Sequence, residues 1–209
     1  MVGEFLPPGW GVQGGRGIAL VVTGPSGAGK SSVIAELLRA DPGLRFAVSA
    51  TTRPRRPDEV DGRDYAFVTD REFDRMLADG ELLEWTVYQG HRYGTPRSQL
   101  EGPLADGRDV VLNVEVSGAL AVAGAGLRRP VVLVFLVPPS WEELARRIQA
   151  RETESQAALR QRLAIARREV QQIHHFHYLV VNDRLEETAS TLAAILAAER
   201  CRVVRCESE

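Results

Sequence analysis

The sequence predicts an α/β protein whose parallel sheet is covered by helices on both faces. Four short runs rich in Val and Leu alternate with segments of helical period, at 18–23, 109–115, 131–137 and 178–182. Because these runs stay apolar at consecutive positions, they indicate strands that are buried on both sides. Buried strands that alternate with helices form a parallel sheet between two helical layers.

A glycine-rich loop follows the first of these strands. It fits the pattern G-x-x-x-x-G-K-[ST] and precedes a helical pattern, and its residues are Gly24, Pro25, Ser26, Gly27, Ala28, Gly29, Lys30 and Ser31. Glycines let successive backbone N–H groups point into one concavity that a phosphate fills, and the helix adds its positive end. Lys30 is expected to reach the β- and γ-phosphates, and Ser31 to hold Mg²⁺. The sequence therefore predicts a P-loop NTPase core.

Length and composition are ordinary for a soluble globular protein. The chain has 209 residues, of which 44% are hydrophobic and 26% charged, enough for one α/β domain with a small insertion. A net charge of −2 gives no field that favours nucleic acid or an anionic membrane. No run approaches the roughly 18–20 apolar residues of a membrane span, and no secretory signal pattern opens the chain. We therefore expect a cytoplasmic protein without nucleic-acid or membrane partners.

The two ends of the chain carry few signals. Residues 1–16 are rich in Gly and Pro, which predicts a flexible N-terminal tail. Cys201 and Cys206 lack the C-x-x-C spacing of a zinc or redox site. Two cysteines are few for a disulfide-stapled secreted fold, so we expect reduced thiols.

Three helices are predicted in the second half of the chain. The first covers 140–150; it begins at Ser140 and carries Glu143 at the position of a capping box. The second, at 157–175, is long and charged and has one apolar stripe. The last covers 185–200 and is rich in Ala and Leu.

Residues 49–104 differ from the rest of the chain. Short strands at 64–68 and 82–85 alternate with loops rich in Pro, Gly and Arg, and one short helix covers about 70–79. This pattern predicts a mixed α/β insertion between two strands of the core.

An arginine-rich loop lies near the start of this insertion. Arg53, Arg55 and Arg56 fall within four residues, and Pro54 and Pro57 stiffen the segment. Arginine forks pair with phosphate oxygens in a bidentate manner, and a stiff loop loses less entropy when an anion binds. A second phosphate site is one interpretation, and a solvated basic loop or a nucleic-acid patch is the other.

Glu84 is a carboxylate within an otherwise apolar strand, Leu82-Leu83-Glu84-Trp85. A half-buried carboxylate needs hydrogen-bond donors. Guanine offers two adjacent donors, N1–H and N2–H₂, that match the two carboxylate oxygens, whereas adenine lacks that pair. Strand alternation also permits a Glu84 that faces solvent, so both orientations stay open.

The chain resembles the guanylate kinase family from about residue 17 to residue 200. Matching blocks occur in the family's order and spacing, at 24–32, 48–53, 59–68, 83–85, 93–95, 138–140 and 181–183. The resemblance implies an ATP:GMP phosphotransferase that converts GMP, and also dGMP, to the diphosphate. It implies a P-loop core at 17–48 and 105–209, a GMP-binding insertion at 49–104 and a small lid at about 147–157.

The resemblance also implies roles for individual residues. The GMP phosphate is held by residues that match Arg53, Arg56, Tyr65 and Tyr93. Guanine is read by residues that match Ser49, Glu84 and Thr95, and Glu115 is a further candidate for the guanine edge. ATP is bound by Gly24, Pro25, Ser26, Gly27, Ala28, Gly29, Lys30, Ser31 and Ser32, with Asn182 near the adenine. The expected catalytic residues are Lys30 and the lid arginines Arg147, Arg151 and Arg162.

Two positions depart from the family pattern. Relatives usually carry an acidic residue, a hydrophobic residue and aspartate after the strand that follows the insertion, whereas this chain has Asn113-Val114-Glu115. A neutral Asn113 leaves its help to Mg²⁺ in doubt, and Glu115 keeps a negative charge on a longer arm. In the lid, Glu152 stands where relatives have glycine, which removes a flexible φ angle and adds a charge near the phosphates.

The implied reaction needs positioning and charge neutralisation, because the acceptor is already an anionic phosphate oxygen. No strong general base is required, and we interpret His91, His174, His175 and His177 as non-catalytic. A phosphopeptide-binding scaffold that resembles the family is the alternative. Such scaffolds typically lose the P-loop lysine and glycines, which this chain keeps. The expected ligands are therefore ATP with Mg²⁺ and GMP; the oligomeric state is not predicted.

Overall fold

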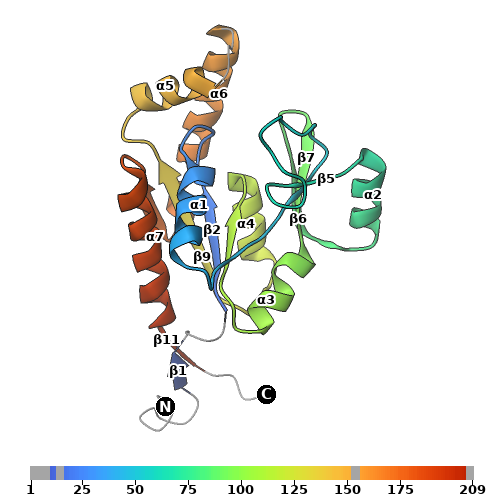
Figure 1. Cartoon of the computed structure of the whole chain (residues 1–209), viewed down its shortest axis with the longest axis vertical. Coiled ribbons are helices and arrows are strands. Elements are labelled where there is room, and N and C mark those ends of the chain that lie inside the picture. The colour runs from blue at the N-terminus through green and yellow to red at the C-terminus, as the bar shows by residue number, and fades with distance from the viewer. Residues whose placement is uncertain (1–9, 13–16, 152–155, 206–209) are drawn as a thin grey trace.

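The larger part of the molecule is built around a five-stranded parallel sheet with the order β10-β9-β2-β8-β3 (Figure 1). The computed structural model describes residues 10–12, 17–151 and 156–205. The strands of this sheet are β2 (Ala19–Thr23), β3 (Arg45–Phe46), β8 (Val110–Asn113), β9 (Val131–Val137) and β10 (Tyr178–Val181). The four predicted strands are confirmed, whereas β3 is too short to produce a hydrophobic run.

Both faces of this sheet are buried, as the continuous apolar runs predict. Leu20 and Val22 of β2 pack on one face with α1 (Lys30–Ala40) and α7 (Leu185–Arg200), which lie side by side in Figure 1. Ala19 and Val21 point to the other face, which α3 (Glu101–Ala105) and α4 (Val116–Gly124) cover. The central strand therefore separates two apolar layers, and its carboxyl end leads into the P-loop.

A second, four-stranded sheet forms a lobe beside the core, with the order β5-β4-β7-β6 (Figure 1). Its elements are β4 (Ala50–Thr51), β5 (Ala66–Phe67), β6 (Leu82–Tyr88), β7 (His91–Pro96), α2 (Asp70–Ala78) and the 3₁₀ turn η1 (Arg97–Gln99). Phe73 of α2 is fully buried against Ala50 and Leu82. The strands expected at 64–68 and 82–85 lie in this sheet. Two strands were not predicted from the sequence, because β4 has only two residues and β7 is polar.

Two further helices stand at the end of the parallel sheet where β2 enters the P-loop (Figure 1). They are α5 (Trp141–Arg151) and α6 (Gln156–Val170), which share a small apolar cluster around Leu144 and Ile148. Ser140 Oγ accepts the Glu143 N–H at 3.2 Å. The Glu143 side chain accepts hydrogen bonds from Arg146 and Arg147 of α5. The predicted helix 157–175 ends earlier, at Val170, and the 3₁₀ turn η2 (Ile173–His175) leads to β10.

The described parts of the two chain ends pair with each other. β1 (Trp10–Val12) and β11 (Val203–Arg205) form an antiparallel ribbon, so this part of the expected flexible tail is paired with another strand. The rest of 1–16 lies outside the described residues, as does Cys206, whereas Cys201 is a free, exposed cysteine. Among the described helices, none has the length and apolar character needed to cross a membrane.

Candidate active site

The P-loop joins β2 to α1 through backbone conformations that favour glycine. Gly24 has a φ angle of 139°, and a Cβ there would lie 2.0 Å from the carbonyl oxygen of Leu136 in β9. Gly29 has a φ angle of 93°, and a Cβ there would lie 2.3 Å from Asn182 Nδ2. Any side chain would both strain the backbone and collide with these atoms. The glycine spacing therefore reflects how closely the loop approaches the neighbouring strands.

Asn182 follows β10 and braces the P-loop from below. Its side chain is only 6% exposed, and its Nδ2 donates to the Ala28 carbonyl at 2.7 Å. Thr188 Oγ1 lies 3.0 Å from Asn182 Oδ1 and 2.8 Å from the Arg184 carbonyl oxygen, so these two acceptors share its one proton. This bracing role was not expected from the sequence, because it depends on the packing of the end of β10 against the loop.

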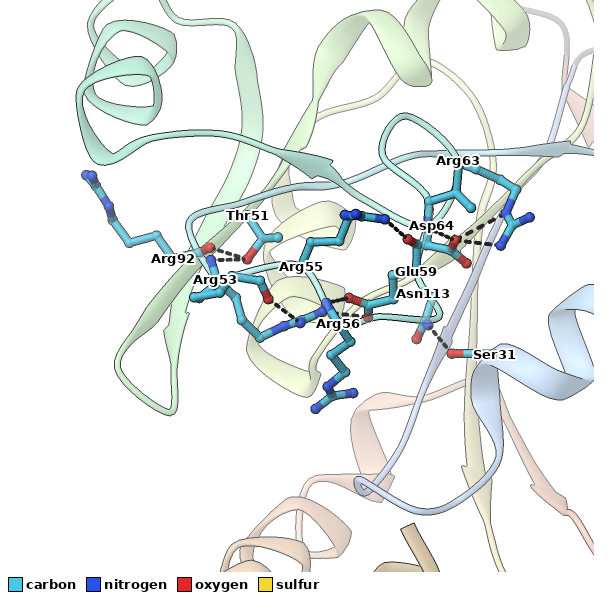
Figure 2. A network of polar contacts seen from close by, with 12 residues as sticks. Ser31, Thr51, Arg53, Arg55, Arg56, Glu59, Arg63, Asp64, Arg92 and Asn113 are labelled. Carbon is cyan, nitrogen blue, oxygen red and sulfur yellow. Dashed lines mark hydrogen bonds and ion pairs between the residues drawn. The ribbon is translucent and has the colours of Figure 1, made fainter. Parts of the chain in front are cut away.

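Lys30 and Ser31 begin α1 at the mouth of the loop. Lys30 Nζ donates to the Gly24 carbonyl at 2.5 Å, and an ammonium group keeps two further N–H donors for a phosphate. Asn113 at the end of β8 donates through Nδ2 to Ser31 Oγ at 3.2 Å (Figure 2). Asn113, which departs from the family pattern, therefore contacts Ser31, the residue that is expected to hold the metal.

The donor set around Ser31 fits a Mg²⁺ ion that arrives with a nucleotide. Mg²⁺ keeps several waters and is usually held by substrate phosphates with one or two protein oxygens. The Ser31 hydroxyl retains a lone pair for such a cation when it accepts the Asn113 N–H. In the part of the chain that the structure describes, no group of three His, Cys, Asp or Glu could hold a metal by itself.

The arginines of α5 and α6 approach the P-loop to different extents. A Cβ on Gly27 would lie 3.0 Å from Ile148 of α5, so α5 packs directly over the loop. Arg147 lies beside Gly29, and its Nε donates to Glu143 Oε1 at 2.6 Å. Hydrogen bonds from Arg146 and Arg147 lower the pKa of Glu143 to about 2, so this carboxylate stays charged at neutral pH. The Arg151 side chain and Glu152 lie outside the described residues.

The arginine-rich loop is folded around one carboxylate, that of Glu59 (Figure 2). Arg53 Nη2 donates to Glu59 Oε1 at 2.7 Å, and the Arg56 N–H donates to Glu59 Oε2 at 2.9 Å. Thr51 Oγ1 accepts the Arg53 N–H at 3.1 Å and so ties the loop to β4. The side chains of Arg53 and Glu59 are each only 13% exposed. These contacts argue against a freely solvated basic loop.

The arginine loop and the P-loop face the same cavity. A cavity of about 160 Å³ is lined by Lys30, Ser31, Arg53, Arg56 and Arg162, together with both tyrosines of the predicted phosphate site. A larger cleft of about 800 Å³ adjoins it between α1 and the loop that follows Arg56. Burial raises the pKa of Tyr65 to about 12, so its phenol stays protonated and can donate to an anion. Two positively charged anion sites therefore meet in one place.

Of the predicted base-reading residues, all but Thr95 line a smaller adjoining cavity of about 20 Å³. Its lining includes Ser49, Glu84 and Glu115. Glu84 is only 7% exposed, which excludes the solvent-facing orientation. Thr95 Oγ1 donates to Glu84 Oε1 at 2.6 Å, so the single hydroxyl proton of Thr95 is directed at Glu84. Thr95 therefore orients the Glu84 carboxylate.

A β-bulge turns Glu84 into the protein. The pairing of β6 with β7 shifts between Leu82 and Glu84, where Leu82 faces Pro96 and Glu84 faces Thr95. Because Leu83 is the extra residue of this bulge, strict alternation fails and three consecutive side chains are buried. Burial raises the pKa of Glu84, and the hydrogen bond from Thr95 opposes this rise only in part.

Three unpartnered carboxylate oxygens gather near the cleft. Among the described side chains, Oε2 of Glu84, Glu115 and Glu169 is buried without a hydrogen-bond partner. Burial raises the pKa of Glu169 to about 7, and the charge of Glu115 adds to the rise while that of Lys30 opposes it. Glu169 was not predicted from the sequence. Its spacing gave a signal of burial, because Glu169 lies three residues after Ala166 and four before Ile173, on the predicted apolar stripe.

The fold and these two facing anion sites define a P-loop protein of the nucleotide-kinase type. A family model described as guanylate kinase matches residues 16–199. The chain is 46% identical over 190 residues to the guanylate kinase of Symbiobacterium thermophilum, covering 91% of this chain and 89% of the relative. It is 43% identical over 190 residues to that of Thermotoga maritima, covering 91% of each. A crystal structure of guanylate kinase from Anaplasma phagocytophilum matches with a TM-score of 0.76 at 34% identity, covering 90% of this chain and 88% of that chain. The chain belongs to the guanylate kinase family.

Replacing Glu169 by glutamine should raise stability at alkaline pH. The folded protein holds a proton on Glu169 up to about pH 7, whereas the unfolded chain releases it near the ordinary value of 4.5. The free energy of unfolding of the wild type therefore falls as pH rises between these values, and the penalty is complete above them. Glu169→Gln should raise the melting temperature by roughly 2–4 °C at pH 8 and by less at pH 5.

Glu186→Gln, at an exposed position of α7, is the control for Glu169→Gln. A gain that does not depend on pH would contradict the buried-charge explanation.

Removing the Glu59 carboxylate should weaken the arginine loop. Glu59→Ala deletes the acceptor for Arg53 Nη2 and for the Arg56 N–H, so both groups lose their fixed positions. We expect the KM for the monophosphate substrate to rise by about tenfold, on the scale of a lost charged hydrogen bond, with an unchanged KM for ATP. Steady-state kinetics check this, with Glu101→Ala at a surface Arg–Glu pair as the control. A lower KM would mean that Glu59 competes with the phosphate.

Proposed function

We propose that the protein transfers the γ-phosphate of ATP to GMP, and also to dGMP, in a reversible reaction. The observation that carries this proposal is the single cavity lined by Lys30, Ser31, Arg53, Arg56 and Arg162. Phosphoryl transfer between two nucleotides requires two phosphate sites that face each other without protein between them. Membership of the guanylate kinase family supports GMP as the acceptor. We further propose that the reaction takes place in the cytoplasm.

The ATP site in this proposal is the P-loop and its braces. The backbone from Gly24 to Ser32 surrounds the phosphates, and the positive end of α1 adds to the attraction. Ser31 takes part in holding Mg²⁺, which supplies charge neutralisation for the transferred phosphate when bound. Asn182 stays beneath the loop, where it supports the phosphate-binding backbone beside the predicted adenine.

The GMP phosphate in this proposal is bound by Arg53, Arg56, Tyr65 and Tyr93. Arginine forks and protonated phenols match the oxygens of a phosphate dianion. Glu59 fixes Arg53 before the substrate arrives, which reduces the entropy lost on binding.

The guanine base is proposed to bind against Glu84, with Ser49, Thr95 and Glu115 around it. Glu84 Oε2 is buried and has no partner among the described residues, so it is open to an N–H donor of the base. Guanine N1–H and N2–H₂ supply such donors, whereas adenine would leave the carboxylate unpaired at a considerable cost. Thr95 keeps the carboxylate in the required orientation.

The transfer step in this proposal needs no base, because an anionic phosphate oxygen of GMP attacks the γ-phosphorus directly. The bond between the γ-phosphorus and the β–γ bridging oxygen breaks, and ADP leaves with that oxygen. Lys30 and Arg162 line the cavity and neutralise the charge that spreads over the transferred group. Arg147 lies beside Gly29 and joins them when the lid, which we place at about 147–157, closes. Closure of this lid and of the insertion at 49–104 onto the core excludes water.

A phosphopeptide-binding scaffold is the competing function, and the P-loop argues against it. Gly24, Gly29 and Lys30 are present and have the geometry of a phosphate-binding loop. The test is an assay of ADP release with ATP and Mg²⁺, offering GMP, dGMP, AMP, UMP and CMP in turn. Turnover with GMP and dGMP alone supports the proposal. Absence of turnover with all five contradicts it and favours the scaffold.

Replacing Lys30 by alanine should abolish most of the phosphoryl transfer. The ammonium group is the positive charge at the mouth of the P-loop, and its loss removes charge neutralisation in the transition state. We expect kcat to fall by about 10²–10³-fold or more, on the scale of one lost electrostatic donor. Single-turnover measurements check this. Circular dichroism should show an unchanged fold, and a kcat near that of the wild type would rule out the assigned role.

Replacing Glu84 by glutamine should damage the use of GMP far more than that of ATP. The amide places an NH₂ group where guanine also presents donors, so one favourable contact becomes repulsive. The expected rise in the KM for GMP is about tenfold to a hundredfold, with little change in the KM for ATP. Glu81→Gln, an exposed neighbour just before β6, is the matched control. An unchanged KM for GMP would remove Glu84 from the base-reading site.

A further inference from the structure

Gly118 lies in helix α4, where nothing in the backbone conformation requires a glycine. It is the third residue of the helix, and its φ angle is not in the left-handed region, so alanine could adopt the same backbone. Glycine loses more conformational freedom than alanine when a helix forms. The glycine is also buried, so its surroundings decide what a side chain would meet.

What a side chain at Gly118 would meet is the carboxylate of Glu84. A Cβ there would lie 2.9 Å from Glu84 Oε2 and 3.4 Å from Val114 Cβ. Glu84 Oε2 is the buried oxygen that has no hydrogen-bond partner among the described residues. The other carboxylate oxygen is held by Thr95 at 2.6 Å, so the carboxylate cannot swing away without breaking that bond.

The helix cannot easily move away either. Ser117, the residue before Gly118, forms a 3.0 Å hydrogen bond between its Oγ and the Oγ1 of Thr86 on β6. Val116 and Ala119 are buried, and Ala119 belongs to the apolar layer on this face of the sheet. Helix α4 and strand β6 are therefore locked together around the point where Gly118 and Glu84 approach each other. Both residues line the small cavity that also contains Ser49 and Tyr93.

We propose that Gly118 is a specificity-determining residue, whose missing side chain keeps Glu84 Oε2 in place and open to an N–H donor of the purine base. A methyl group would press on this oxygen or displace the carboxylate from the base. This inference rests on the proposed reading of guanine by Glu84. Gly118 does not take part in the chemistry; it acts through Glu84, so it is a positioning residue rather than a catalytic one.

The chain offers a matched pair of substitutions for the test. Gly118→Ala and Gly124→Ala both replace a glycine of α4, but a Cβ at Gly124 would have no atom within 4 Å. For Gly118→Ala we expect the KM for GMP to rise by about tenfold or more, an unchanged KM for ATP, and a smaller preference for GMP over IMP, which lacks the 2-amino group. For Gly124→Ala we expect wild-type kinetics. Melting temperatures of both variants show that they fold.

A double-mutant cycle with Glu84→Gln separates this inference from the proposed function. If Gly118 acts through Glu84, adding Gly118→Ala to Glu84→Gln should raise the KM for GMP little further. Fully multiplied effects would overturn the inference, as would a Gly118→Ala variant that melts at a lower temperature but keeps the wild-type KM for GMP. If Glu84→Gln alone leaves the KM for GMP unchanged, the proposed base reading fails, and the role of Gly118 fails with it.

Discussion

The site depends on the central position of β2, which is hydrogen-bonded to β8 on one side and to β9 on the other. This parallel register places the carboxyl ends of the neighbouring strands beside the P-loop, as is general for binding sites of open α/β sheets. Leu136 of β9 then lies against Gly24, and Asn113 of β8 lies against Ser31. Asn182 after β10 completes the support from below. Residues at the ends of three neighbouring strands therefore lie close to the P-loop, and this close packing requires glycine at positions 24 and 29.

The cleft combines opposite charges that are not fully paired with each other. Arg53 has its carboxylate partner in Glu59, and Arg147 has one in Glu143. The buried Oε2 atoms of Glu84, Glu115 and Glu169, in contrast, have no hydrogen-bond partner among the described residues. Buried polar atoms without partners are rare and lower the free energy of unfolding, and such costs are typical of functional sites. At Glu84 we attribute this cost to binding, because a guanine base brings the missing donors.

The features that could be predicted from the sequence are those that depend on a local pattern of residues. The P-loop could be predicted because its glycines, Lys30 and Ser31 lie within one short segment. The buried strands could be predicted because each one is a continuous apolar run, which is visible without knowing the strand beside it. Glu84 was ambiguous because its burial depends on a bulge at Leu83, which arises from pairing with a distant strand. Glu169 was missed because its surroundings follow from the packing of α6 against residues far away in the sequence. The bracing role of Asn182 depends on strand order, which periodicity does not reveal.

A single ligand that spans the P-loop and the arginine loop shows whether the two loops form one continuous site. Such a ligand has adenosine and guanosine joined through their 5′ oxygens by a chain of phosphates, and calorimetry measures its binding. We expect one molecule to bind per chain, more tightly than ATP or GMP alone, and to displace both nucleotides. The analogue with adenosine at both ends should bind more weakly, because Glu84 would remain unpaired. Two molecules bound per chain, or displacement of only one nucleotide, would mean that the two loops form separate sites.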